Sequence, residues 1–514
     1  MASFSSLPQE LVDRIADELY CEHPSVDEEA RKALLACALV DKSFYEAARR
    51  HLLSEVAIHD RDSMNVALRR RLKLYPDTPD RLRSLRLHIT NPYFFFASVP
   101  DLLPSLLAHP LNVKQVAILR NPTLSGSPSS PSGVLSTDLF KDLLSVVGSS
   151  IDHAHFFSTI TTLHLRFLTF TLRHMVTFKC LQTLILEDCN FRGDEDGDSK
   201  VLSDHAAFKS LEVLSVSAKD HQGSLPRFQD VLYGVEKRRV AFSSLAVFRW
   251  VGGCSNLQSV SCFLRDYGIS TNLVKLDMTI EIDDTYSTLD SHAPYPNPGY
   301  RLDLSALPKL RDLRLKWVLP TLSRVLLLYL RQTTIFSILR PSRSIPSMKV
   351  KNVHLSLSMP WSSDGTQLNA SDGIQFKAWK DIGALDSIDQ IISDAFLYPV
   401  LRTFRFSLLI RVSSKQEDEA KENSPILTDD LPSHFPLLNR STSIKTSFET
   451  EVVIGTTQAP PRPTSSCPFF MFLPGIPHSQ AASQPIALPP SAQGIDSEDG
   501  AYHDEEETED SPSG

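Results

Sequence analysis

A short apolar triplet recurs along most of this chain and limits what it can fold into. In each copy, two residues separate the first apolar residue from the second, and one residue separates the second from the third. Residues two apart in a strand point to one face of a sheet, so each triplet predicts a short strand with one buried face. The ten copies are Leu82-Leu85-Leu87, Val113-Val116-Ile118, Ile160-Leu163-Leu165, Leu181-Leu184-Leu186, Leu211-Leu214-Val216, Leu245-Phe248-Trp250, Leu273-Leu276-Met278, Leu310-Leu313-Leu315, Val350-Val353-Leu355 and Leu401-Phe404-Phe406.

The triplet resembles the signature of leucine-rich repeats. Its clearest copy begins at Leu181 and continues with Cys189 and the apolar Phe191. The resemblance implies an irregular leucine-rich-repeat solenoid, in which each unit buries its apolar face only by stacking on its neighbours. Successive copies start 21 to 51 residues apart, so the array is irregular. Ordinary strands of an α/β domain are the alternative reading of the same triplets.

The N-terminus predicts a helix with a single apolar stripe. Leu7, Leu11, Ile15 and Leu19 recur every four residues, behind a capping-box spacing that begins at Ser6. Side chains four apart lie on one helix face. The stripe therefore runs along one side of this helix.

Two further helices are expected before residue 55. Ser25 and Glu28 have the capping-box spacing, and Asp41 is an N-cap residue ahead of Phe44 and Leu52. Domains of about this size bury only ~60% of the surface that the unfolded chain exposes. Part of the apolar stripe is therefore expected to meet another surface, within this chain or on a partner.

Four short motifs in this region, taken in order, resemble the F-box family, particularly its fungal members. They are Leu7-Pro8-Gln9-Glu10-Leu11, Leu34–Val40, Lys42-Ser43-Phe44 and Ala48–Leu52. The resemblance implies docking onto a Skp-type adaptor and, through it, a place in a cullin–RING ubiquitin ligase. The adaptor-facing positions that it implies are Leu7, Pro8, Leu11, Ile15, Leu39, Val40 and Phe44, with Leu19 shared between core and contact.

These patterns predict three parts. An F-box is expected over residues 1–58, a degenerate leucine-rich-repeat solenoid over 59–410, and a disordered acidic and Pro/Ser-rich tail over 411–514. The fold class expected is thus α/β, with three N-terminal helices, an irregular solenoid and a disordered tail. Surface loops rich in Ser, Pro or Gly are candidate contacts with a protein target. They are 121–133, 283–299 and 361–373.

The sequence carries no recognisable chemistry for catalysis. It has no phosphate-binding glycine loop, no nucleophile elbow and no cysteine–histidine spacing typical of a metal site, so we expect neither an enzyme nor a cofactor or metal. A formal net charge of -9 argues against nucleic-acid binding. The most apolar run, Val325–Leu330, is far short of the ~20 residues that span a bilayer.

Two functions follow as expectations. The first is the substrate-recognition subunit of a Skp–cullin–F-box ubiquitin ligase, soluble and located in the cytoplasm, the nucleus or both, with an unknown protein target. The alternative is an interaction scaffold without a ligase role, in which the N-terminal helices only cap the solenoid.

Overall fold

The computed structural model describes part of the chain. Two compact units divide the sequence, Met1–Thr457 and Gln458–Gly514, and all described residues lie in the first. The described residues are 7–19, 28–90, 95, 102–106, 113–120, 153–170, 178–191, 210–218, 242, 244–253, 257–266, 271–282, 304, 307–319, 339, 349–360, 384–414 and 417–454.

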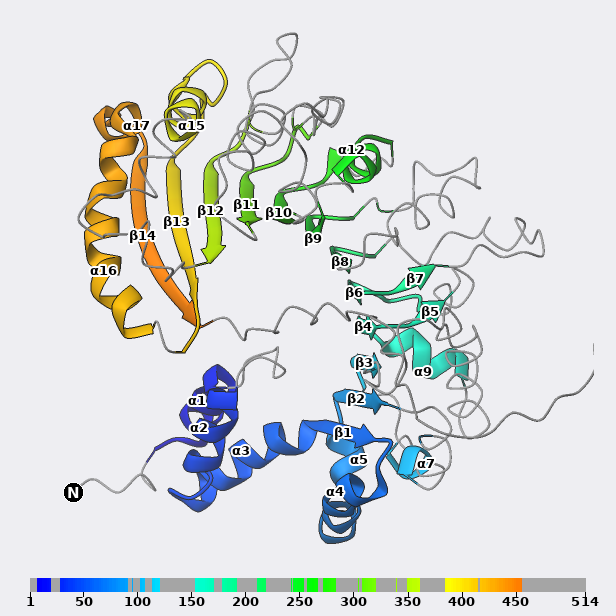
Figure 1. Cartoon of the computed structure of the whole chain (residues 1–514). Coiled ribbons are helices and arrows are strands. Elements are labelled where there is room, and N and C mark those ends of the chain that lie inside the picture. The colour runs from blue at the N-terminus through cyan, green and yellow to red at the C-terminus, as the bar shows by residue number, and fades with distance from the viewer. Residues whose placement is uncertain are drawn as a thin grey trace, which may run out of the picture. The chain divides into compact units, whose positions relative to one another are not determined.

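One sheet of twelve strands organises this unit, and its strands lie side by side in chain order (Figure 1). Every neighbouring pair is parallel. The strands are β1 (Glu55–His59), β2 (Ser84–Ile89), β3 (Gln115–Arg120), β4 (Thr162–Arg166), β6 (Thr183–Glu187), β8 (Val213–Ala218), β9 (Val247–Gly253), β10 (Lys275–Glu281), β11 (Asp312–Val318), β12 (Asn352–Pro360), β13 (Thr403–Val412) and β14 (Lys445–Ile454). Two short strands, β5 (Thr169–Phe170) and β7 (Asn190–Phe191), pair separately.

The apolar triplets explain why these segments are strands. The last two members of all ten triplets lie in strands, as predicted, and their side chains are buried. On β6, Leu184 lies beside Leu163 of β4 and Leu214 of β8, so the same position recurs from strand to strand. Full burial of one such side chain stabilises the fold by roughly 1.5–3 kcal/mol. The largest members of this core are Trp250 and Trp317.

Helices connect some strands and cover others. Among the described residues, α16 contacts β14, and the Ser424 hydroxyl on this helix donates a hydrogen bond of 3.2 Å to the Thr450 carbonyl. This contact covers the last strand, whose outer backbone groups have no further strand as a partner. Besides the three N-terminal helices described below, the helices are α4 (Asp62–Leu74), α5 (Thr78–Arg81), α7 (Leu102–Leu106), α9 (His153–Thr159), α12 (Leu257–Asp266), α15 (Ala384–Ser393), α16 (Glu417–Asp430), the 3₁₀ helix η13 (Leu431–His434) and α17 (Pro436–Arg440).

This architecture corrects the fold class expected from the sequence. The expected fold class, an F-box followed by an irregular leucine-rich-repeat solenoid, is wrong, because twelve of the fourteen described strands join in one all-parallel sheet of an α/β fold. A triplet predicts only that a strand buries one of its faces. The same pattern is expected in a leucine-rich-repeat solenoid and in an α/β domain. Strand pairing decides between them, and pairing joins residues that are far apart in the sequence. The α/β alternative is therefore the reading that the sheet supports.

The beginning of the expected tail is also corrected. Residues 411–454 were assigned to a disordered segment, but they complete β13 and form α16, η13, α17 and β14. The charged run at 415–422 made α16 hard to predict from the sequence. Ala420 is buried, but most of the described side chains of this helix are not. The expected boundary between residues 58 and 59 falls inside β1. Residues 455–514 and the three candidate target-binding loops lie outside the described residues.

Candidate protein-docking surface

Three N-terminal helices enclose a small core of their own. They are α1 (Gln9–Leu19), α2 (Glu28–Cys37) and α3 (Lys42–Ser54). Their buried side chains form a cluster that is separate from the core of the sheet. The members of this small core are Val12, Ala16, Leu34, Phe44, Ala47 and Ala48.

Local sequence fixes where α3 begins and ends. The predicted N-cap is confirmed, since the Asp41 carboxylate accepts a 2.8 Å hydrogen bond from the Ser43 backbone N–H. The same carboxylate accepts from the Ser43 hydroxyl at 2.7 Å, and the bonds from Ser43 hold the pKa of Asp41 below its usual value. At its other end α3 passes directly into β1 between Ser54 and Glu55. The helices and the sheet are thus joined without a linker.

Large apolar side chains are exposed on α1 and at the end of α2. Of the fourteen exposed large hydrophobic side chains among the described residues, six lie between Leu11 and Tyr45. Five of them define what we call the apolar surface: Leu11 (48% exposed), Ile15 (41%), Leu35 (48%), Leu39 (89%) and Val40 (54%). Clustered exposure of this kind marks interaction sites more often than scattered single residues do.

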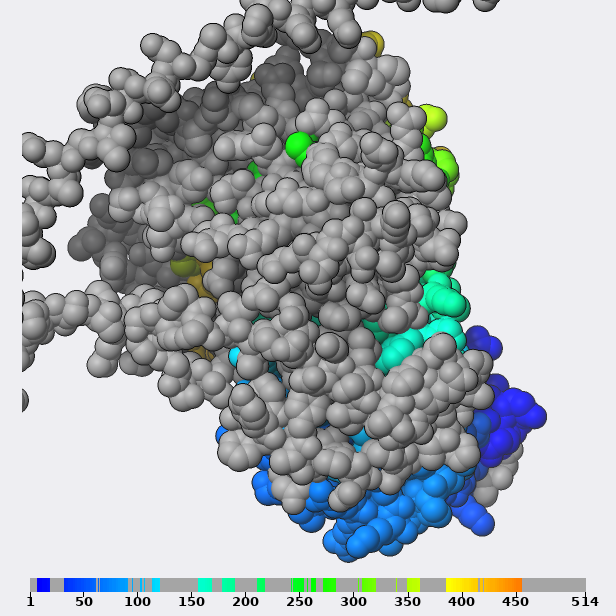
Figure 2. Space-filling view, turned by 90° about the vertical axis from the view of Figure 1, so that its right-hand side faces the viewer, coloured from blue at the N-terminus to red at the C-terminus, as the bar shows by residue number. Residues whose placement is uncertain are grey.

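Helical spacing accounts for part of this surface. Leu11 and Ile15 are four residues apart on α1, so they share one face of this helix and present an apolar stripe. Leu35 lies on α2, whereas Leu39 and Val40 lie in the turn that follows its last residue, Cys37. The space-filling view shows the N-terminal residues, in dark blue, at the molecular surface (Figure 2).

The residues expected to face an adaptor fall into two groups. Leu11, Ile15, Leu39 and Val40 are exposed, and so is Pro8. The second group consists of Leu7, Leu19 and Phe44.

Phe44 is a correction to the expected contact set. Its side chain is 5% exposed and belongs to the small core, so it supports the surface from beneath. Leu7 is half-buried against the same core, and Leu19 ends α1 with a side chain outside the described set. Sequence reasoning missed Leu35 as an exposed residue. The available signal was its place directly after the core residue Leu34, since adjacent residues of a helix do not share a face.

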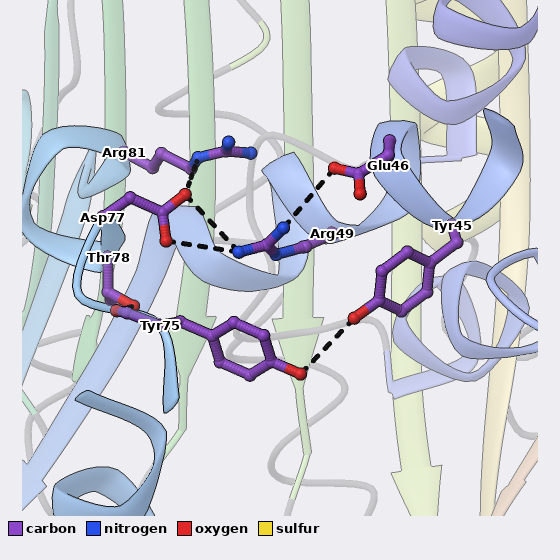
Figure 3. A network of polar contacts seen from close by, with 7 residues as sticks. All are labelled: Tyr45, Glu46, Arg49, Tyr75, Asp77, Thr78 and Arg81. Atoms are coloured by element: carbon purple, nitrogen blue, oxygen red, sulfur yellow. Dashed lines mark hydrogen bonds and ion pairs between the residues drawn. The ribbon is translucent and has the colours of Figure 1, made fainter. Parts of the chain in front are cut away.

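A polar network ties α3 to the connection between α4 and α5 (Figure 3). Arg49 donates to the two carboxylate oxygens of Asp77 at 3.2 and 3.5 Å, and Arg81 contacts the same carboxylate at 2.9 Å. Arg49 also lies over the ring of Tyr75, whose hydroxyl is 3.4 Å from that of Tyr45. These contacts fix α3, and with it the small core, against the segment that follows β1.

The junction between α3 and β1 is held from the other side by α4. Arg71 on this helix donates to the Leu52 carbonyl at 3.0 Å and to the Glu55 carbonyl at 3.3 Å. Glu55 in turn pairs with Arg86 on β2 at 2.6 Å. The Leu52 and Glu55 carbonyls thereby have hydrogen-bond donors, and these bonds fix the orientation of α3 relative to β1.

Ion pairs join α1 to α3. Arg50 contacts Asp13 at 2.6 Å, and His51 contacts Asp17 at 2.8 Å. The hydrogen bond from Gln9, reinforced by Arg50, holds the pKa of Asp13 below its usual value. Burial lowers the pKa of His51. Asp13 and Asp17 each follow an exposed apolar residue of α1 by two positions, so these ion pairs lie on a different face of the helix from Leu11 and Ile15.

The described residues offer no other chemistry at this site. Within the described part of the chain, no three metal-ligating side chains come together, and no helix there is long and apolar enough to cross a membrane. No family model matches the sequence, and no curated protein matches it either. What the geometry offers is a surface suited to binding another protein.

Proposed function

We propose that the chain is the substrate-recognition subunit of a Skp–cullin–F-box ubiquitin ligase. The apolar surface on α1 and α2 binds a Skp-type adaptor, and the part that contains the sheet presents a protein target. In this role the chain does not form the covalent bond to ubiquitin. It raises the effective concentration of the target near the ubiquitin-charged enzyme. Such a ligase subunit works in the cytoplasm, the nucleus or both.

The exposed apolar side chains support this function. Leu11 and Ile15 on α1, and Leu39 in the turn after α2, belong to a group of helices whose small core does not include them. Burying them against a partner would contribute roughly 25 cal/mol for each Å² of apolar surface removed from water. Nothing in the fold of the described residues requires these side chains to be apolar.

The alternative, a capping role, requires the apolar stripe to lie against the end of the sheet. Outside the sheet, β1 is contacted by α4 and α3, whereas Leu11 and Ile15 on α1 are exposed. A cap that leaves its stripe uncovered would not shield the first strand. We therefore favour adaptor binding.

The test replaces both α1 anchors with acids. Leu11→Asp with Ile15→Asp should abolish co-purification of the full-length chain with a Skp-type adaptor, because a few central apolar residues usually dominate an interface. Both side chains are more than 40% exposed, so the fold should survive. Circular dichroism and urea unfolding of the same variant check that point.

The matched control makes the same change elsewhere on the surface. Val66 and Leu74 on α4 are 59% and 61% exposed. Val66→Asp with Leu74→Asp should leave adaptor capture unchanged. Equal capture by the wild type and by the α1 variant would refute adaptor binding through α1.

A further inference from the structure

Basic side chains line the edge of the sheet where its last strands begin. Six of them define what we call the basic edge: Lys309, Arg311, Lys349, Lys351, Arg402 and Lys445. They lie at, or within three residues before, the first residues of β11, β12, β13 and β14. Lys275 begins β10 at the same edge.

Backbone hydrogen bonds place four of these basic residues next to one another, at the starts of four adjacent strands. The Lys351 N–H donates to the Arg311 carbonyl, the Arg402 N–H to the Lys351 carbonyl, and the Lys445 N–H to the Arg402 carbonyl, each at 2.8 Å. Neighbouring strands are ~4.8 Å apart, so the four positions span about 14 Å. An extended peptide covers that distance in roughly four residues.

Few acidic groups offset this charge. Among the described residues at the starts of β10 to β14, Asp312 is the one acidic side chain, and it accepts a 2.5 Å hydrogen bond from Asn352. Farther along the same face, Glu449 is already paired with Arg405 and also accepts from Ser407. Arg405 therefore leaves this carboxylate little capacity to neutralise the basic edge.

Folding alone does not account for such an arrangement. Like charges on adjacent strands destabilise a sheet, and the chain as a whole is acidic, with a formal net charge of -9. Arg402 is exposed, and no salt bridge to it occurs within the described residues. A ligand with closely spaced negative charges would relieve the repulsion. Arg and Lys clusters bind acidic segments of proteins in this way.

We propose that the basic edge binds an acidic segment of the target protein, a run of about four to six Asp and Glu residues in extended conformation. This inference rests on the proposed function, since it names the class of target that the subunit presents. Single-stranded nucleic acid is a less suitable ligand for the basic edge than an acidic peptide. The strand-start residues that carry these cations include no aromatic side chain on which bases could stack.

The experiment measures peptide binding to the full-length chain. The probe is a fluorescein-labelled peptide of six glutamates between Gly-Ser flanks, followed by fluorescence anisotropy at low and moderate salt. Arg402→Gln with Lys445→Gln should weaken binding at least tenfold, and salt should weaken binding to the wild type. A peptide with glutamines in place of the glutamates should not bind.

The control removes two exposed cations elsewhere. Arg70→Gln with Lys73→Gln on α4 changes the net charge equally and should leave peptide affinity within twofold. Equal affinities of the two double variants would overturn the inference, and so would tighter binding of a single-stranded oligonucleotide of the same charge. Adaptor co-purification should be normal in both variants, so failure at the basic edge is distinguishable from failure of the proposed function.

Discussion

The guanidinium of Arg49 lies over the ring of Tyr75, with its carbon 4.6 Å from the ring centroid (Figure 3). The two residues belong to different parts of the unit, since Arg49 is on α3 and Tyr75 ends α4. The Tyr75 carbonyl also accepts a 2.7 Å hydrogen bond from the Thr78 hydroxyl. Because the Arg49 guanidinium is stacked on Tyr75 and also bonded to Asp77, the orientation of α3 relative to β1 is fixed. The proposed receptor role would use this fixed relation to hold a target at one position relative to the adaptor.

Arg49→Ala should lower the free energy of unfolding by about 1–2 kcal/mol. It removes a cation–π contact and a charged hydrogen bond at a site where the Arg49 side chain is 20% exposed. Arg50→Ala is the matched control, because Arg50 is 51% exposed and pairs with a surface carboxylate, Asp13. Surface pairs contribute about 0–1 kcal/mol. Urea unfolding of both variants checks this, and equal losses would contradict a special role for Arg49.

Phe44→Ala should destabilise the three N-terminal helices by roughly 3–5 kcal/mol, because it leaves a cavity in their small core. Leu39→Ala, at a side chain that is 89% exposed, should change the stability little. Amide hydrogen exchange in α1 and α3 reports the difference, with faster exchange in the Phe44 variant alone. If both variants exchanged like the wild type, Phe44 would not be a core residue.

Asp389→Ala should cost about 1–3 kcal/mol of stability. This carboxylate is 2% exposed, and its two oxygens accept hydrogen bonds of 2.8 and 2.9 Å from the Leu437 and Leu438 backbone N–H groups. Loss of an acceptor leaves buried donors on α17 unpaired. Asp386→Ala, on an exposed position of the same helix, is the control and should stay within about 0.5 kcal/mol. Thermal or urea unfolding separates the two variants.

His88 should make the fold sensitive to mild acid. Its ring stacks on that of His59 with centroids 4.6 Å apart, and burial, with His59 and Arg86 adding, lowers its pKa from 6.5 to about 4. Between these two values the unfolded chain binds more protons than the folded one. Stability is therefore fully present above the unfolded pKa and is lost as the pH falls toward the folded pKa.

The measurement compares the wild type with His88→Gln. Between about pH 7.5 and about pH 5, the wild type should lose roughly 1–2 kcal/mol more in urea unfolding, after a discount for the solvent that reaches the ring. Identical pH dependence in the two proteins would show that His88 does not titrate as its burial implies. His59, whose pKa is also lowered by burial, remains in both proteins.

Much of the local structure was predictable because its causes are local. Apolar spacing located ten of the twelve strands in the sheet, and side-chain chemistry located the cap at Asp41. The exposure of Leu11 and Ile15 was also expected, because three short helices cannot cover every apolar residue that they carry. Leu39 and Val40 were expected at the surface only because the F-box resemblance implied it, and both are exposed.

Other features depend on residues that are distant in the sequence. Phe44 was expected at the surface, but its ring is enclosed by α1 and α2, and that enclosure is a property of packing. The edge strands β1 and β14 do not contain the apolar triplet. β14 is defined by its pairing with β13. The basic edge is likewise scattered from Lys309 to Lys445 and becomes one feature only in the sheet.

The amino-acid sequence by itself determined where ten strands of the sheet and the three N-terminal helices form, because capping and apolar periodicity act over a few residues. Tertiary structure alone decided that the strands join in a single parallel sheet and which side chains remain at the surface. The physical reason is that hydrogen bonds between strands and burial in a core link residues tens of positions apart. No short segment carries that information.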